Sequence, residues 1–173
     1  MNPPPQNNNR PRRPKPFQAS NPIRVAARAV VVRDNKLLAV ILRDQTGPFY
    51  VLPGGGQKHG EELYNTVRRE CAEELGISVE PYKMLYVREY IGKNHDFAAR
   101  HKHFHQVEVV FACDLVEEGN IGHGSEQDTR QVGYKWIPLE ELRETRFFPS
   151  LFKTFLNDQN ELEIPTDYLG DIN

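Results

Sequence analysis

The segment RRECAEELG, residues 68–76, places three glutamates, Glu70, Glu73 and Glu74, within five positions. In a helix, residues spaced i, i+3 and i+4 share one face, so the three carboxylates project together. Like charges at this spacing destabilise a helix by about 0.2–0.5 kcal/mol per pair. The acidic face must therefore either meet only water or gain from binding a cation.

The residues around the glutamates predict a helix over residues 62–75. Its apolar stripe lies about 110° around the helix from the glutamates, at ~100° per residue. The helix can thus pack on a sheet while its carboxylates stand at the edge of a cleft. Gly76 follows where a left-handed cap is expected. The stripe consists of Tyr64, Val67, Cys71 and Leu75.

The rest of the chain alternates between strand-like and helical patterns, which predicts an α/β or α+β sandwich. We expect one folded domain over residues 23–158, with tails at 1–22 and 159–173. The predicted strands are 23–32, 36–43, 49–53, 84–91, 106–115 and 131–138, and the predicted short helices are 139–144 and 149–158.

Residues 1–22 differ in composition from the rest. They hold seven of the 13 prolines and four basic residues but no acidic one, before a body with 18 basic and 24 acidic residues. Such a segment has little to bury, so we expect a disordered tail. Four charges on a flexible arm bind nucleic acid weakly at physiological salt, so no nucleic-acid partner is expected.

Cys71 and Cys113 are the two cysteines, too few for a disulfide scaffold, and they favour a reducing cytoplasm. No apolar stretch approaches the roughly 20 residues that span a bilayer, and the N-terminus lacks a signal-peptide core. We expect a cytoplasmic protein with no membrane partner. Whether it forms a homodimer is left open.

Three glycines, residues 54–56, precede the predicted helix. Glycine allows the backbone to approach a bound phosphate or metal closely. Carboxylate oxygens suit hard cations, and Mg²⁺ commonly takes one or two protein carboxylates together with phosphate oxygens. The acidic face is therefore predicted to be a metal platform rather than a solvated surface.

At these residues the chain resembles the Nudix hydrolases. Their box reads G-x5-E-x7-R-E-U-x-E-E-x-G-U, where U is a bulky apolar residue. Ile77 fills the last U, whereas Cys71 fills the first with a smaller side chain. The resemblance covers about residues 23–157. Seven residues match the box: Gly55, Glu61, Arg69, Glu70, Glu73, Glu74 and Gly76.

The resemblance implies an α/β/α sandwich with a mixed sheet and the hydrolysis of a phosphoanhydride in a nucleoside diphosphate linked to another moiety. Arg69 and Glu61 would pair to hold the loop on the helix, and Gly55 and Gly76 would shape the box. The ligands of Mg²⁺ or Mn²⁺ would be Glu70, Glu73, Glu74 and the Gly54 carbonyl, and the catalytic residues Glu70, Glu73 and Arg69.

The general base differs among members of this family. Some use a box glutamate, for which Glu70 is the candidate here, and others use an acid from a later loop. Such acids are present at Glu117, Glu118, Glu126 and Asp128.

His101, His103 and His105 alternate, which leaves three roles open: a zinc site, the lining of a pocket, or packing. Pocket lining is favoured over zinc because fixed metal sites usually draw ligands from several elements.

The basic segment that contains Lys93, Arg100 and Lys102 could meet phosphate or ribose oxygens beside the acidic helix. It favours a sugar nucleotide or ADP-ribose-like substrate first and a nucleoside triphosphate second, with Arg100 and His103 as substrate contacts. The alternative function is a Nudix-fold module that binds a nucleotide without cleaving it. The presence of every box glutamate favours the enzyme.

Overall fold

Two five-stranded β-sheets form the centre of the molecule. The structure is a computed structural model that describes residues 22–96, 98–117, 121–122, 124–125, 131–164 and 167–173. The first sheet has the order β10-β6-β7-β1-β5, and in the second β2, β3, β4 and β9 follow one another while β8 pairs with β3.

Both parallel and antiparallel pairs occur in the first sheet: β1 runs parallel to β7 and antiparallel to β5, and β6 runs antiparallel to β7 and parallel to β10. Its strands are β1 (Arg24–Val30), β5 (Gly54–Gly56), β6 (Ser78–Ile91), β7 (His105–Glu117) and β10 (Asp167–Asp171). The strands of the second sheet are β2 (Val32–Arg33), β3 (Lys36–Asp44), β4 (Gly47–Val51), β8 (Gln131–Pro138) and β9 (Phe147–Phe148).

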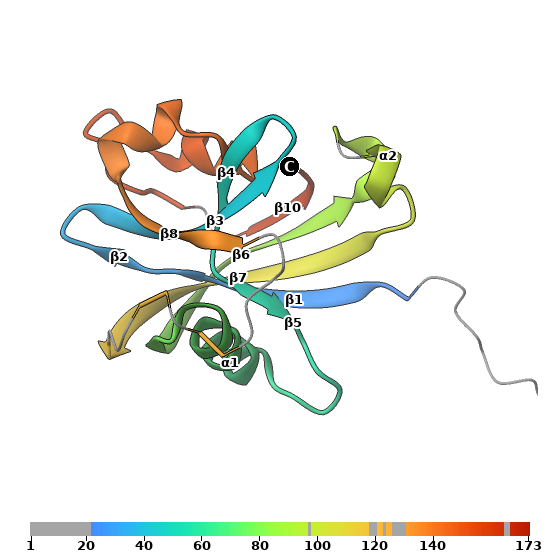
Figure 1. The fold of residues 1–173 in the computed structure, drawn as a ribbon, viewed down its shortest axis with the longest axis horizontal. Helices are drawn as coiled ribbons and strands as arrows, with labels where there is room; N and C mark the ends of the chain where they lie inside the picture. Colours follow the sequence, from blue (N-terminus) through green and yellow to red (C-terminus); the bar gives the residue numbers. More distant parts are fainter. Residues whose placement is uncertain (1–21, 97, 118–120, 123, 126–130, 165–166) are drawn as a thin grey trace, which may run out of the picture.

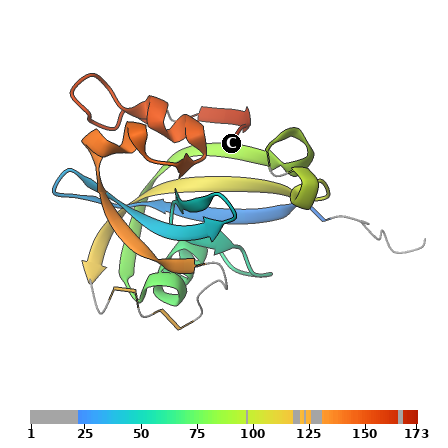
Figure 2. The ribbon, with the colours of Figure 1, turned by 45° about the horizontal axis from the view of Figure 1, so that its top comes forward.

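Helical segments cover the sheets from opposite sides (Figures 1 and 2). The helix α1 (Leu63–Leu75) lies on one side, and the 3₁₀ helices η2 (Leu139–Glu144) and η3 (Ser150–Phe155) lie on the other. Two short helices, η1 (Gly92–Asn94) and α2 (Ala98–His101), connect β6 to β7. The mixed, layered α/β fold expected from the sequence is confirmed, with two sheets in place of one.

Each side of the sheets has its own apolar core. One core joins α1 to β1, β3 and β7 through residues such as Val67, Cys71 and Leu75, each 0% exposed. The other joins η2 and η3 to the opposite side, with Leu142 and Phe152 also fully buried. Burying one such side chain stabilises the fold by about 1.5–3 kcal/mol.

The observed helix α1 agrees with the predicted one to within a residue at its start. Gly76 adopts the left-handed conformation at φ 69°, and its N–H donates to the Ala72 carbonyl at 3.0 Å. One member of the predicted apolar stripe differs: Tyr64 is 39% exposed, although its ring packs edge-on against Phe111. Thr66 takes the buried position instead.

The predicted strand over residues 23–32 is divided between β1 and β2, and a turn with Asp34 and Asn35 at φ 50° and 58° leads into β3. Both residues at positive φ form the turn that matches the twist of a hairpin. The two C-terminal helices are 3₁₀ rather than α-helical.

Residues 159–173, expected from the sequence to form a tail, contribute strand β10 to the first sheet. Arg88 donates to the Ile172 carbonyl at 2.5 Å. Asp171 accepts hydrogen bonds from the Ile91 N–H at 2.8 Å and from Asn94 at 2.6 Å. This segment therefore fixes the start of the β6–β7 connection.

The expected tail at residues 1–22 lies outside the described residues except for Pro22. None of the described helices has the length and apolar character needed to cross a membrane.

Candidate functional site

The acidic face of α1 lies against the glycine strand β5. A Cβ atom on Gly55 would overlap the Glu70 carboxylate, and one on Gly54, whose φ is 126°, would overlap the Ala27 carbonyl. The Gly54 N–H donates to Glu74 Oε2 at 2.9 Å. Glycine at these two positions therefore lets the backbone touch both the neighbouring strand and the carboxylates of α1.

Arg69 joins the parts of the box. It donates to both oxygens of Glu61, at 2.8 and 2.9 Å, and to the Gly56 carbonyl at 2.9 Å. The same guanidinium reaches Glu70 and Glu73, each at 2.7 Å. Arg69 thus connects Glu61 and Gly56, which precede α1, to the carboxylates on α1 itself.

The Arg69 hydrogen bonds lower the pKa of Glu61 to about 2, with further hydrogen bonds from the Lys58 N–H and the Thr66 hydroxyl. Burial acts to raise the pKa of Glu73, but hydrogen bonds from Arg69 and Lys58 outweigh it, so this pKa is lowered. Both carboxylates therefore stay ionised at neutral pH.

Glu70, Glu73 and Glu74 line one cavity of about 360 Å³. Their oxygens are the hard donors that Mg²⁺ and Mn²⁺ prefer, and within the described part of the chain Glu70 Oε2 makes no hydrogen bond. The donor chemistry fits a divalent cation. Still, no three His, Cys, Asp or Glu side chains of the described residues already stand in an arrangement that could hold one.

The Gly54 carbonyl, predicted to be a further ligand, accepts a hydrogen bond from Arg28. Arg28 also donates to Glu108 at 3.1 Å. The carbonyl is thus engaged by a cation of the protein itself.

A second cavity, of about 200 Å³, adjoins the first. We call it the aromatic cleft, because Phe49, Tyr90, Phe104 and Phe148 contribute to its lining. The β3–β4 hairpin and α2 both contribute to its lining, and both rise above the sheets in Figure 1. The two cavities share Arg24, Arg28, Leu42 and Val51 in their linings, so they lie side by side.

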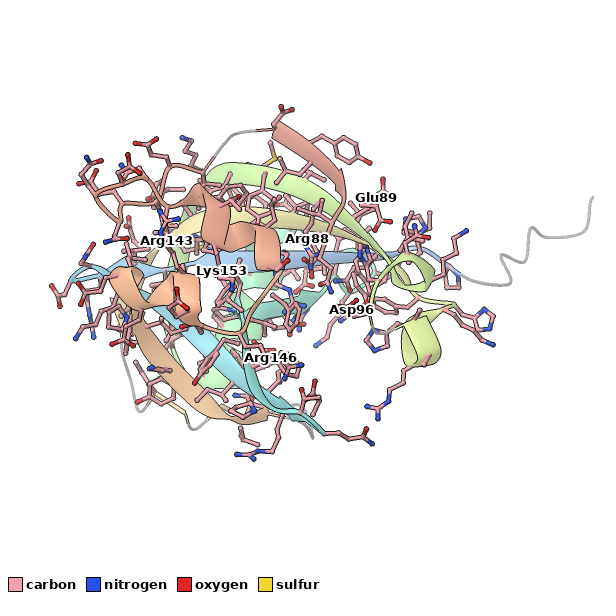
Figure 3. The ribbon with its side chains drawn as sticks, turned by 90° about the horizontal axis from the view of Figure 1, so that it is seen from above. Arg88, Glu89, Asp96, Arg143, Arg146 and Lys153 are labelled. Carbon is pink, nitrogen blue, oxygen red and sulfur yellow. The ribbon has the colours of Figure 1, made fainter. Side chains whose placement is uncertain are left out.

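Neighbouring strands of the first sheet carry a stripe of polar side chains across the floor of the cleft. Arg24 donates to Gln106 at 2.7 Å, and Gln106 donates to Glu108 at 2.6 Å. Arg88 donates to Glu108 at 2.5 Å from the other side. In the view from above, Arg88 lies between η3 and α2 (Figure 3).

Glu108 is only 3% exposed, and burial acts to raise its pKa. Its ion pairs with Arg28 and Arg88 outweigh burial, so the pKa is lowered and the carboxylate stays charged. Sequence reasoning missed this stripe. Its signal was the pair of polar residues, Gln106 and Glu108, two apart and directly before the apolar run of residues 109–113.

The predicted substrate contacts separate in space. Arg100, on α2, lines the aromatic cleft, whereas His103 is exposed and lines neither cavity. His101 does line the cleft, with its Nδ1 3.0 Å from the Tyr90 hydroxyl. His105 lies 2.7 Å from Glu89.

The three histidines thus have three different surroundings, and the described residues form no zinc-type cluster. Of the later acids considered as the general base, Glu117 ends β7. Glu118, Glu126 and Asp128 lie outside the described residues.

The sequence model of the NUDIX domain matches residues 22–157. The chain belongs to the Nudix family. Nudix hydrolase 6 of Arabidopsis thaliana is 26% identical over 135 residues, an alignment that covers 74% of this chain and 44% of that protein. The chain therefore spans less than half the length of this relative.

Solved Nudix structures share the fold. A NUDIX hydrolase from Nitrosomonas europaea superimposes with a TM-score of 0.58 at 22% identity, covering 72% of this chain and 78% of that one. An ADP-ribose pyrophosphatase from Streptococcus suis has a TM-score of 0.54 at 18% identity, covering 84% and 98%. The Nudix box of this chain is thus the β5–α1 segment described above.

Proposed function

We propose that this Nudix protein is a Mg²⁺- or Mn²⁺-dependent hydrolase that cleaves a phosphoanhydride bond in a nucleoside diphosphate linked to another moiety. One observation carries the proposal: the cavity lined by the box glutamates shares four lining residues with a cleft lined by aromatic rings and arginines. Such a site has room for a diphosphate at the glutamates and for a ring-bearing group beside it.

In this proposal Glu70, Glu73 and Glu74 hold the metal. When bound, the cation neutralises the diphosphate and lowers the pKa of an attacking water. Glu70, held by Arg69 at 2.7 Å, accepts the proton of that water. Arg24 and Arg28, which line both cavities, meet the phosphate oxygens that face away from α1.

The aromatic cleft supports a substrate with a bulky group beyond the scissile diphosphate. ADP-ribose-like compounds and sugar nucleotides are therefore our first choice, and nucleoside triphosphates are the second. The ring of Phe49, which is partly exposed in this lining, suits stacking on a base.

A panel of ADP-ribose, sugar nucleotides, NADH, dinucleoside polyphosphates and nucleoside triphosphates tests the proposal in the presence of Mg²⁺. We expect a nucleoside monophosphate and a second phosphorylated product from at least one member. Glu70→Gln and Glu74→Gln should each lower kcat strongly. Glu80→Gln, which removes an acid that pairs with Arg68 outside the cavity, is the matched control and should retain the rate.

A nucleotide-binding module without activity is the competing function. It predicts tight binding of a panel member, with no product at any metal concentration. That result would overturn the hydrolase proposal.

A further inference from the structure

The aromatic cleft has a pronounced excess of positive charge. Its lining holds five arginine side chains and only two acidic side chains, Asp44 and Glu108. Asp44 is already paired with Arg146 at 2.7 Å, and Arg146 does not belong to the lining. Glu108 is shared by Arg28 and Arg88. The two acids therefore leave most of the cleft's positive charge unbalanced.

Three of the arginines make no ion pair with any described residue: Arg24, Arg43 and Arg100. Arg24 lines both cavities and so lies where the diphosphate of the proposed substrate enters the cleft. Arg43 and Arg100 line the cleft alone. These last two charges therefore lie apart from the metal cavity.

Arg43 and Arg100 come from the two walls of the cleft. Arg43 belongs to β3 of the hairpin and Arg100 to α2 on the other side (Figure 1). Both are exposed at the rim, so a group of the ligand can reach them without rearrangement of the sheet. Between these walls lie rings from both sides, Phe49 on the hairpin and Tyr90 and Phe104 near α2.

We propose that the aromatic cleft binds a phosphate monoester of the substrate, in addition to the scissile diphosphate. The inference rests on the proposed function, because the diphosphate bridge places the rest of the substrate in the cleft. A phosphate monoester carries a charge of about −1.5 to −2 at pH 7, which matches two guanidinium groups better than a single carboxylate does. Arginine also binds phosphate oxygens in pairs, with a geometry that lysine cannot copy. The substrate class is thus a nucleotide with a phosphate monoester on its ribose.

Binding of simple bisphosphates tests this inference without turnover. The full chain with Mg²⁺ is titrated by calorimetry with adenosine 2′,5′-bisphosphate, adenosine 3′,5′-bisphosphate and 5′-AMP. We expect at least one bisphosphate to bind roughly tenfold or more tightly than 5′-AMP, since hydrogen bonds between charged groups at a partly open site have that strength. Comparison of the two bisphosphates separates a 2′ from a 3′ position.

In the double variant Arg43→Gln/Arg100→Gln, the affinity for the bisphosphate should exceed that for 5′-AMP by less than about twofold, so the advantage of the bisphosphate is lost. Arg43→Lys/Arg100→Lys keeps the charge and should retain part of it. Lys36→Gln removes a positive charge at the opposite end of β3, about 23 Å from Arg43 at 3.3 Å per residue, and should leave the full advantage. Equal binding of all three ligands by the wild type would overturn the inference, and so would an advantage that survives in the double glutamine variant.

Matched substrates separate this inference from the proposed function. NADPH and NADH differ by one 2′-phosphate, and coenzyme A and dephospho-coenzyme A differ by one 3′-phosphate. Preferred hydrolysis of a phosphorylated member, lost in the double glutamine variant, supports both proposals. Hydrolysis of both members of each pair at equal kcat/KM overturns the phosphate site and leaves the hydrolase standing. Tight bisphosphate binding without turnover of any diphosphate supports the phosphate site and overturns the hydrolase.

Discussion

Replacement of Glu108 by glutamine should destabilise the protein strongly while the shape of the side chain is kept. The carboxylate is 3% exposed and binds two arginines, Arg28 at 3.1 Å and Arg88 at 2.5 Å. Removal of one member of a buried ion pair costs about 3–5 kcal/mol, because the remaining charge is buried without a partner. Arg28 keeps backbone acceptors at residues 52 and 54, and Arg88 keeps the Ile172 carbonyl, so the lower end of this range applies.

We therefore expect Glu108→Gln to lower the free energy of unfolding by about 3 kcal/mol. For a chain of this size that corresponds to a decrease in Tm of roughly 6–12 °C. Urea denaturation followed by circular dichroism measures the first quantity, and a thermal scan measures the second. A loss below about 1 kcal/mol would refute the role of Glu108 in balancing the charges of the half-buried Arg28 and the buried Arg88.

The charge of the Glu108 carboxylate also determines how the stability of the protein depends on pH. The folded-state pKa of Glu108 is lowered, so its stabilisation is complete above the unfolded pKa of about 4.3 and is lost as the pH falls through the folded value. The stability difference between wild type and Glu108→Gln should be constant from pH 7 to about pH 5 and shrink at lower pH. A difference that grows on acidification would contradict the assignment.

Three further predictions follow from burial and hydrogen bonding. The Cys71 thiol is 0% exposed and burial raises its pKa. A thiol reagent should therefore modify Cys71 only after the protein unfolds. Modification at the rate of an exposed cysteine would contradict this packing. In Arg69→Lys, the lysine side chain cannot bridge Glu61 and Glu70 together. The variant should therefore have a lower kcat and a free energy of unfolding lower by about 1–3 kcal/mol. A variant unchanged in both quantities would refute the bridging role. Deletion of residues 1–22 should leave Tm and kcat unchanged, because this proline-rich segment has little to bury, and a large loss of activity would show that it contributes to the site.

The local parts of the site were predictable from the sequence. The helix α1 follows from periodicity, and its end at Gly76 follows from the need for a left-handed cap. The closeness of Gly55 to Glu70 is likewise encoded within a short stretch of chain. Neighbours in sequence set these features, so a pattern can report them.

The polar stripe and the last strand were not predictable in this way. Arg24 and Gln106 are 82 positions apart, and Arg28 and Glu108 are 80 apart, so only the parallel pairing of β1 with β7 brings them together. Strand β10 has no apolar alternation of its own, and its place depends on its pairing with β6. The aromatic cleft, which draws its lining from several elements of the fold, therefore appeared only in three dimensions.

The most direct test of the central claim is the rate of nucleoside monophosphate release from the best panel substrate during a Mg²⁺ titration. The wild type, freed of metal with EDTA, should be inactive and should regain a saturable rate as Mg²⁺ is added. The double variant Glu70→Gln/Glu74→Gln should lose at least about 100-fold in rate at every Mg²⁺ concentration, with its melting transition preserved. A wild-type rate that persists in EDTA, or a double variant that turns over as fast as the wild type, would contradict the assignment of the acidic face of α1 as a metal-dependent hydrolytic centre.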